Sequence, residues 1–311
     1  MLRTEENKNT IYALVGPTCT YKSKFAIELS QKYPLEIISC DSRLVYKNMD
    51  IGTSKPTVDE RKGVPHYMID LIEPGFDYSV GLYKKEAEKK IHEILSRKRI
   101  PFFVGGTGLY LNSVLLGLSI PEVKPDLSFR RQLKDFTQEE LYKNLYDLDP
   151  QAAKIIHKND NFRTIRALEV IYKTNKLFSA LKKRREIPYK VIWIGLAYQD
   201  RDIHKERIRK RTKAFCDDGF INEVENLLGK YGELDLFKRT IGYSEAIEYL
   251  KNKITKDEMI EKITLHTKQF AKRQMTWFRS NKSIQWVYLD KGDVDLRDIG
   301  SFAKTSNVSM S

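Results

Sequence analysis

The chain of 311 residues has little cysteine and no long apolar run. Its three cysteines, Cys19, Cys40 and Cys216, show no CxxC spacing and cannot all pair, so we interpret them as reduced thiols. The polar segment 1–10 lacks the apolar core of a secretory signal, and no apolar run approaches the length of a membrane span. These absences argue against a secreted or membrane protein, and we expect the chain to work in the cytoplasm.

Acidic residues are outnumbered as well: 55 Lys and Arg against 42 Asp and Glu give a formal net charge of +13. A surplus of this size favours a polyanionic partner, of which nucleic acid is the commonest, although a merely basic soluble enzyme remains an alternative. Hydrophobic residues make up 41% of the chain and charged residues 31%, a composition that indicates a soluble globular protein. The length suffices for one large domain or two modest ones, and we expect a monomer.

Short apolar runs alternate with helical patterns along much of the chain. Runs at 11–15, 35–39, 100–104 and 191–197 predict buried strands, and two of the intervening segments have the spacing of helices. Strands separated by helices imply right-handed βαβ units, so the predicted fold class is α/β with a parallel sheet. Ligands of such sheets bind beyond the carboxyl ends of the strands, where Lys22, Asp41 and Thr107 all fall.

Residues 118–190 differ from this pattern. They lack strand patterning, contain short helical stretches and are rich in basic residues. We interpret them as an inserted all-helical domain, so that the core consists of residues 1–117 and 191–311. The last residues, about twelve of them, are small and polar, and we expect them to be disordered.

After the fourth predicted strand the pattern becomes helical again. Thr255 and Glu258 have the spacing of a capping box, in which the hydroxyl and the carboxylate satisfy free backbone donors at a helix start. The helix that follows carries an apolar stripe that includes Phe270 and Trp277, and we expect Trp277 to lie in the core.

The segment Gly16-Pro17-Thr18-Cys19-Thr20-Tyr21-Lys22-Ser23 follows the first predicted strand and precedes a helix, which is the context of a phosphate loop of the form GxxxxGK[ST]. Such a loop binds phosphate through backbone N–H groups and a helix N-terminus, with a lysine for the anion and a hydroxyl for Mg²⁺, here Lys22 and Ser23. Tyr21 stands where the pattern has its second glycine. If a positive φ is required there, a side chain costs about 1–2 kcal/mol. A strand–turn–helix with an incidental Lys-Ser pair is the alternative.

Asp41 follows the second predicted strand, and the residues alone leave three interpretations open. It could hold Mg²⁺ as in an ATPase, act as a general base beside the phosphate loop, or cap the segment that follows. The third strand ends in Gly105-Gly106-Thr107 and not in an acidic residue, which weakens an ATPase or kinase interpretation. The five histidines are scattered without ligand spacing, which argues against a metal site at His66.

These motifs, in this order and spacing, resemble the tRNA dimethylallyltransferase family, also called tRNA isopentenyltransferases or IPP transferases. The resemblance covers about residues 10–286. It is carried by the phosphate loop and by the segments 41–56 (DSRLVYKNMDIGTSKP), 66–70 (HYMID), 104–110 (VGGTGLY), 166–170 (RALEV) and 272–277 (KRQMTW). The segment 41–56 is the most specific of them.

The resemblance implies a P-loop kinase-like α/β core with a helical insertion. It also implies a reaction: transfer of a dimethylallyl group from dimethylallyl diphosphate to N6 of the adenosine 3′ of the anticodon in tRNA, with Mg²⁺ as cofactor. The phosphate loop would bind the diphosphate and not ATP that is hydrolysed. By the same resemblance Asp41 is the general base, Thr107 orients the reacting groups and contacts tRNA, and Lys22 neutralises the leaving group.

Further site residues follow from the resemblance. Arg239 is expected to join the diphosphate site, and Mg²⁺ to be bound by Ser23 and, through water, by Asp41. The residues implied to contact tRNA are Asp41, Ser42, Arg43, Leu44, Thr107, Arg130, Phe162, Arg163, Thr164, Ile165 and Arg166, together with Lys272 and Arg273, which would meet phosphates. For each single basic residue a solvated helix face is an equally good interpretation.

Two alternative functions remain open. A kinase of a nucleoside or small metabolite is not among them, because it would need an acidic residue after the third strand and no basic insertion, and the sequence fits neither requirement. A transferase that prenylates free AMP or ADP would share the core but have less need of the insertion. A catalytically weakened paralogue that still binds tRNA has Tyr21 as its support.

Overall fold

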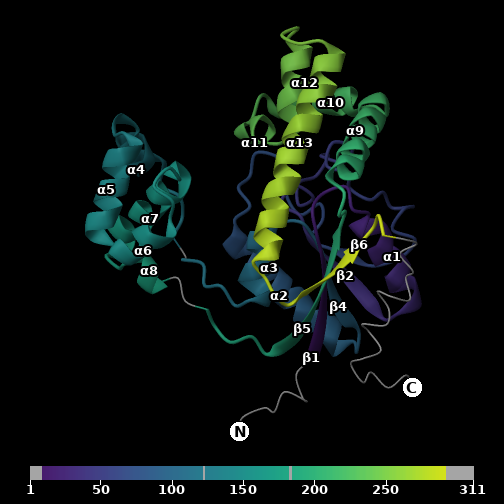
Figure 1. Cartoon of the computed structure of the whole chain (residues 1–311), viewed down its shortest axis with the longest axis horizontal. Coiled ribbons are helices and arrows are strands. Elements are labelled where there is room, and N and C mark those ends of the chain that lie inside the picture. The colour runs from purple at the N-terminus through teal and green to yellow at the C-terminus, as the bar shows by residue number, and fades with distance from the viewer. Residues whose placement is uncertain (1–8, 122, 182–183, 292–311) are drawn as a thin grey trace. The chain divides into compact units, whose positions relative to one another are not determined.

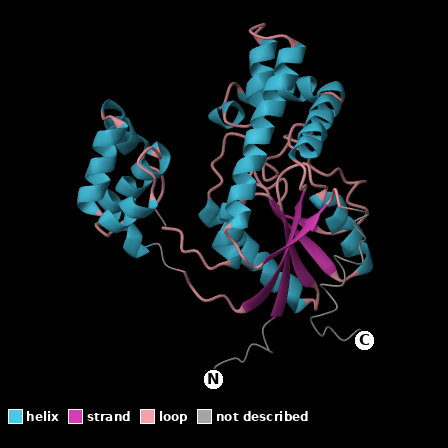
Figure 2. Cartoon of the chain, in the orientation of Figure 1, coloured by secondary structure: helices cyan, strands magenta, loops and turns pink. Residues whose placement is uncertain are grey.

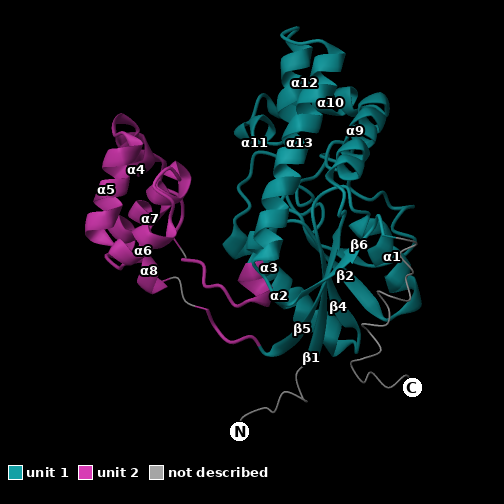
Figure 3. Cartoon of the chain, viewed as in Figure 1, with its two compact units in different colours: residues 1–111, 188–311 teal, residues 112–187 magenta. Residues whose placement is uncertain are grey.

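The computed structural model describes residues 9–121, 123–181 and 184–291. The chain divides into two compact units, residues 1–111 with 188–311 and residues 112–187 (Figure 3). These boundaries, at 111/112 and 187/188, lie several residues before those that the sequence patterns predict, at 117/118 and 190/191. The C-terminal residues that were expected to be disordered lie outside the described residues.

A parallel sheet forms the centre of the first unit (Figures 1 and 2). Within the described residues it has six strands in the order β3-β2-β4-β1-β5-β6, and every neighbouring pair is parallel. The strands are β1 (Asn9–Val15), β2 (Leu35–Cys40), β3 (His66–Tyr67), β4 (Ile100–Gly105), β5 (Tyr189–Ala197) and β6 (Ile284–Tyr288). The predicted α/β class with a parallel sheet is confirmed, and the two edge strands β3 and β6 are additions that the sequence patterns did not predict.

Helices pack against this sheet and beyond the carboxyl ends of its strands (Figure 1). They are α1 (Lys22–Lys32), α2 (Val80–Ser96), α3 (Gly108–Leu115), α9 (Arg201–Asp217), α10 (Phe220–Tyr231), α11 (Asp235–Lys238), α12 (Tyr243–Leu250) and α13 (Lys256–Arg279). One apolar core lies between the sheet and its flanking residues and includes Leu14, Ala26 and Phe102. A second core is built by α9, α10, α12 and α13 around Phe220 and Tyr243, and it also buries Val45 and Met49 from the loop after β2.

Helix α13 begins as the sequence predicts. The hydroxyl of Thr255 accepts the N–H of Glu258, whose carboxylate in turn accepts the N–H of Thr255. Along the apolar stripe Met259, Ile263 and Ala271 are buried and Trp277 is half-buried. Phe270 departs from the expectation: it is exposed, with the guanidinium of Arg273 over its ring. In the part of the chain that the structure describes, no helix is both long and apolar enough to cross a membrane.

The second unit is helical. Its helices are α4 (Leu127–Gln132), α5 (Gln138–Leu148), α6 (Pro150–Ile155), α7 (Asn161–Thr174) and α8 (Phe178–Leu181), with a short 3₁₀ helix at Leu133–Asp135. They enclose a small core that includes Leu141, Leu145 and Leu168. Residues Leu118 and Arg184 form a single antiparallel bridge. The predicted all-helical character of this segment is confirmed.

Candidate active site

The carboxyl ends of three neighbouring strands lie at the same level of the sheet. Val15 of β1 and Cys40 of β2 are both in register with Gly105 of β4. The segments that follow these residues are the phosphate loop, Asp41 and Gly106-Thr107, so they leave the sheet side by side. The structure therefore brings together the three elements that the sequence predicted to share one site.

Residues 16–23 turn tightly between β1 and α1. The hydroxyl of Thr20 donates to the carbonyl of Pro17 at 2.9 Å, and Cys19 and Tyr21 take left-handed backbone conformations with φ of 65° and 56°. Helix α1 begins directly after Tyr21, at Lys22. The turn thus ends in a helix N-terminus whose free backbone N–H groups can bind an anion.

Tyr21 keeps the backbone conformation that the missing glycine would supply. Its φ of 56° and ψ of 19° are left-handed, which costs a side-chain-bearing residue about 1–2 kcal/mol. Its ring lies against the guanidinium of Arg207, with 4.0 Å between the guanidinium carbon and the ring centroid. This cation–π contact with α9 offsets part of the strain. Tyr21 therefore has the left-handed backbone that glycine would adopt and adds an exposed aromatic ring to the surface of the loop.

Lys22 turns back over the loop. Its ammonium donates to the carbonyl of Pro17 at 2.5 Å and to the hydroxyl of Thr20 at 3.4 Å. Burial lowers the pKa of Lys22 to about 8, and nearby Cys19 and Asp41 counteract this while Arg211 adds to it. A bound dianion would stabilise the ammonium and raise this pKa again.

Asp41 and Thr107 belong to neighbouring turns. Asp41 accepts the backbone N–H of Arg43 at 2.8 Å through one carboxylate oxygen, so it also stabilises its own turn, as one of the three interpretations of this residue required. The hydroxyl of Thr107 accepts the N–H of Ser42 at 3.1 Å, and its backbone N–H donates to Cys40 at 2.9 Å. Asp41 and Thr107 are thus held at fixed positions in one hydrogen-bonded layer.

Helix α9 contributes two side chains to the loop that sequence reasoning missed. Arg211 donates to the hydroxyl of Thr18 at 2.6 Å and to the sulfur of Cys19 at 3.1 Å. The ring Nε2 of His204 donates to the carbonyl of Thr18 at 2.9 Å, and burial lowers the pKa of this imidazole. Only the basic composition of 201–211 signalled these contacts, and that composition did not single out either residue.

Arg239, the cation that the resemblance assigned to the diphosphate, lies at the end of α11. Its side chain is 73% exposed and pairs with Asp235 at 3.4 Å. Two other arginines contact the phosphate loop: Arg211 donates hydrogen bonds to it, and Arg207 lies over its Tyr21 ring. The diphosphate role of Arg239 stays a prediction.

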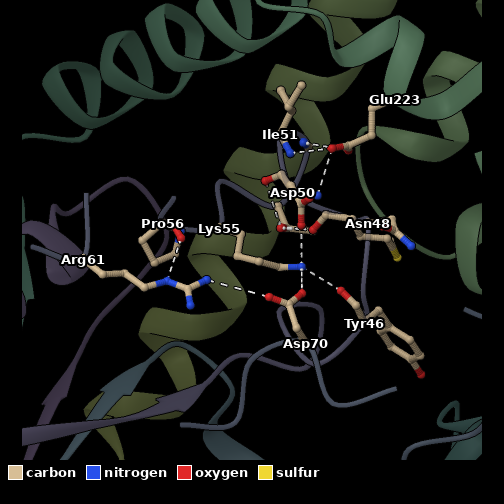
Figure 4. A network of polar contacts seen from close by, with 12 residues as sticks. Tyr46, Asn48, Asp50, Ile51, Lys55, Pro56, Arg61, Asp70 and Glu223 are labelled. Carbon is tan, nitrogen blue, oxygen red and sulfur yellow. Dashed lines mark hydrogen bonds and ion pairs between the residues drawn. The ribbon is translucent and has the colours of Figure 1, made fainter. Parts of the chain in front are cut away.

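The segment 41–56, which carries the most specific part of the resemblance, is held by a buried lysine (Figure 4). The Lys55 side chain is only 3% exposed, and its ammonium donates to Asp50 at 2.6 Å, to Asp70 at 2.5 Å and to the carbonyl of Tyr46 at 2.8 Å. On the other side of the segment, Glu223 of α10 accepts three consecutive backbone N–H groups, from residues 50, 51 and 52. The path of this loop is therefore fixed from two sides.

Arg130 and Arg166, two of the residues implied to contact tRNA, also hold the second unit together. Glu169 is fully buried and receives a bidentate pair of hydrogen bonds from Arg130, at 2.9 and 3.0 Å, and another from Arg166. A buried carboxylate needs such partners, so both arginines stabilise the unit whether or not they also touch RNA.

The remaining residues implied to contact tRNA differ in exposure. Phe162 is 68% exposed and Arg163 lies beside it on the surface, whereas Ile165 is half-buried. The side chains of Leu44 and Thr164 are buried, so a contact at either position would involve the backbone or a neighbour. Lys272 and Arg273 are exposed on α13.

A parallel sheet with a phosphate loop after its first strand places the chain among P-loop α/β proteins. The family model described as IPP transferase matches residues 44–281, and the one described as isopentenyl transferase matches residues 9–73. A tRNA dimethylallyltransferase of Gloeothece citriformis is 44% identical over 279 residues, which are 90% of this chain and 91% of that relative. The chain therefore belongs to the IPP transferase family, as its motifs predicted.

Solved structures agree with this assignment. The full-length tRNA isopentenylpyrophosphate transferase of Bacillus halodurans superposes with a TM-score of 0.72 at 34% identity, covering 96% of this chain and 97% of that one. A eukaryotic dimethylallyltransferase acting on tRNA gives a TM-score of 0.77 at 26% identity, covering 96% of this chain and 77% of that one.

Proposed function

We propose that this chain transfers the dimethylallyl group of dimethylallyl diphosphate to N6 of the adenosine 3′ of the anticodon in tRNA, giving N6-dimethylallyladenosine and diphosphate. The observation that supports this most directly is the meeting of the phosphate loop, Asp41 and Thr107 at adjacent strand ends, in a chain that belongs to the IPP transferase family. An anion site and a carboxylate side by side are what a diphosphate leaving group and a proton-losing nucleophile require.

The diphosphate would bind over the phosphate loop. Backbone N–H groups at the start of α1, the ammonium of Lys22 and the guanidinium of Arg211 surround this position, and they would stabilise the charge that builds on the departing oxygen. The backbone N–H of Thr18 is already bonded, to Gln274 of α13.

Mg²⁺ would be held in part by the hydroxyl of Ser23, which is exposed in the first turn of α1. Among residues 9–121, 123–181 and 184–291 no group of three His, Cys, Asp or Glu could hold a metal. This fits Mg²⁺, which proteins commonly bind through few side chains together with substrate phosphates and water. When bound, the ion would supply charge neutralisation at the diphosphate.

The acceptor nitrogen would approach from the side of Asp41. As the bond from N6 to C1 of the dimethylallyl group forms, the C1–O bond breaks and the diphosphate leaves with its electron pair. The nitrogen then becomes acidic, and a carboxylate oxygen of Asp41 would take its proton. Asp41 is already fixed by the N–H of Arg43, and Thr107 lies in the same hydrogen-bonded layer.

Each unit would bind tRNA through its own exposed aromatic and basic side chains. Single-stranded loops are read by stacking on such groups and by contacts to phosphate. Phe162 and Arg163 of α7 and Lys272 and Arg273 of α13 are exposed side chains of these kinds. Arg130 and Arg166 are less available to bind RNA, because both are paired with the buried carboxylate of Glu169.

A transfer assay tests the proposal. The protein is incubated with unmodified tRNA, dimethylallyl diphosphate and Mg²⁺, and the tRNA nucleosides are then weighed. We expect adenosine heavier by one dimethylallyl group. Product on free AMP or ADP in place of tRNA would favour the nucleotide prenyltransferase. No product with wild-type protein, but product with Tyr21→Gly, would identify a weakened paralogue; the left-handed backbone of Tyr21 argues against that outcome.

A further inference from the structure

The side chain of Gln274 joins two of the strand-end segments of the site. Its Oε1 accepts the backbone N–H of Thr18 at 2.9 Å, and its Nε2 donates to the carbonyl of Gly106 at 3.0 Å. The partners fix the orientation of the amide, because a backbone N–H can only donate and a carbonyl can only accept. Gln274 is only 7% exposed, so water does not compete strongly for these bonds.

The sequence of the β4 turn makes room for this contact. A Cβ atom on Gly106 would lie 2.1 Å from Nε2 of Gln274, and a Cβ on Gly108 would lie 2.1 Å from the indole nitrogen of Trp277, one turn further along α13. Both glycines on either side of Thr107 therefore allow α13 to approach the turn closely. Any other residue at 106 would displace the amide of Gln274.

We propose that Gln274 is a positioning residue: it holds the phosphate loop in register with the turn that carries Thr107, and so aligns the diphosphate-binding N–H groups with the reacting groups. The inference rests on the proposed function for its consequence in transfer, but its consequence for anion binding does not require transfer. One carboxamide that uses its two ends on two different turns resists movement of either turn relative to the other.

Replacing Gln274 by methionine keeps the size of the side chain and removes both hydrogen bonds. It leaves the N–H of Thr18 and the carbonyl of Gly106 without these partners. We expect the dissociation constant of inorganic pyrophosphate to rise by about tenfold or more. Losses of this size are usual for residues that orient a ligand-binding group without touching the ligand. In transfer, kcat/KM for dimethylallyl diphosphate should fall by a similar factor while KM for tRNA stays unchanged.

Gln274→Glu provides a readout that a purely structural role would not move. An ionised carboxylate can accept from Thr18 but repels the carbonyl of Gly106, whereas a protonated carboxyl can accept from one and donate to the other. Burial should raise the pKa of the new carboxyl above its ordinary ~4.3. Pyrophosphate affinity of this variant, divided by that of wild type at the same pH, should therefore recover as the pH is lowered from about 8 to about 5.5.

The matched control is Gln269→Glu, an exposed position on the same helix, whose affinity ratio should not change with pH. Pyrophosphate binding is measured by calorimetry for wild type and all three variants, with urea unfolding as the check on folding. Equal pyrophosphate affinity for wild type and folded Gln274→Met would overturn the inference, as would a pH-independent ratio for Gln274→Glu. Absence of transfer in wild type, with pyrophosphate binding still dependent on Gln274, would instead remove the proposed function and leave the positioning role.

Discussion

At the residue scale, Tyr21 is the clearest departure from the phosphate-loop pattern, and its left-handed backbone is supported by a neighbour. The guanidinium of Arg207 lies 4.0 Å from the centroid of its ring. A half-exposed cation–π pair of this kind contributes about 0.5–1 kcal/mol. Loop strain and this contact should therefore be energetically coupled.

A double-mutant cycle measures that coupling. Arg207→Ala should lower the free energy of unfolding by about 0.5–1 kcal/mol when Tyr21 is present and by less when it is replaced in Tyr21→Gly, because glycine takes positive φ without strain and has no ring to stack. Urea unfolding of the four proteins gives the coupling. Arg209→Ala, an exposed arginine on the same helix that pairs with Glu261, is the control and should show none. A zero coupling for Arg207 would mean that the stacking does not support the loop.

Lys22 makes anion binding depend on pH. Its pKa in the folded protein is about 8, below its ordinary value of 10.5, so the ammonium is the major form only below about pH 8. In the unliganded protein this depression means that stability rises between about pH 8 and pH 10.5, where the unfolded chain binds more protons than the folded one. A diphosphate group binds the ammonium form of Lys22, so its binding takes up a proton between about pH 8 and pH 10.5.

We expect the affinity of wild type for dimethylallyl diphosphate to fall by up to about tenfold for each pH unit above 8. Lys22→Arg provides the comparison, because a guanidinium stays charged throughout this range. Calorimetry in buffers of different ionisation enthalpy should show proton uptake at pH 9 for wild type and not for Lys22→Arg. Identical pH profiles for the two proteins would contradict the assignment of Lys22 to the anion.

Asp41 can be tested without disturbing its turn. Asp41→Asn keeps an oxygen that can accept the N–H of Arg43 but removes the basic carboxylate. Turnover should fall by about 10²–10⁴-fold, the usual range for loss of a general base, with the dissociation constant for tRNA little changed. Single-turnover kinetics and a filter-binding assay separate the two effects. Asp59→Asn, at an exposed position, should leave both constants unchanged, and near-normal turnover of Asp41→Asn would remove the general-base role.

Local sequence patterns were sufficient for the residues that directly follow a strand. The phosphate loop, Asp41 and Thr107 were located in this way, and their neighbourhood is confirmed by the register of β1, β2 and β4. Local patterns could not identify His204 and Gln274 as site residues, because they contact Thr18 from positions 186 and 256 residues away in the sequence. Gln274 lay within a segment that carried the family resemblance, but nothing local indicated that its amide would face two turns at once.

At the scale of elements, two strands begin earlier than the apolar runs in the sequence predict. The predicted first and fourth strands began at residues 11 and 191, whereas β1 and β5 begin at Asn9 and Tyr189. The additional residues pair with one another, Asn9 with Tyr189 and Thr10 with Lys190. Backbone pairing therefore extends both strands by polar residues. β3 is two residues long, too short for any period to be read.

The buried ammonium of Lys55 is one of two groups that hold the loop after β2, and its removal should lower stability. Lys55→Met leaves the carbonyl of Tyr46 and the carboxylates of Asp50 and Asp70 without their shared donor. Because both carboxylates are partly exposed, water can hydrogen-bond to them in place of the ammonium. We therefore expect the free energy of unfolding to fall by about 1–3 kcal/mol. Urea unfolding measures it.

Lys62→Met, at an exposed position of the same loop region, is the control and should change stability by less than about 0.5 kcal/mol. Equal effects of the two substitutions would show that the Lys55 network in Figure 4 contributes no stability beyond that of a surface lysine.

At the scale of the whole molecule, charge and architecture argue for the same partner. The net charge of +13 is spread over a chain whose two compact units both carry exposed basic side chains, such as Arg163 in one and Lys272 in the other. A protein that binds an anticodon loop through such groups displaces counterions from phosphates. Binding should then weaken with salt in proportion to the number of phosphates contacted.

For about six phosphate contacts on single-stranded RNA, the logarithm of the association constant should fall with the logarithm of salt concentration with a slope of about −4. Affinity for tRNA would then drop more than about 100-fold between 50 and 200 mM salt. Replacing Lys272 and Arg273 together by alanine should make the slope shallower by about one to two. The charge-matched control replaces Lys85 and Lys89, two exposed lysines of α2, and should leave the slope unchanged. A slope near zero for wild type would mean that the surplus charge does not bind tRNA phosphates, and equal slopes for the two double variants would mean that α13 is not among the contact surfaces.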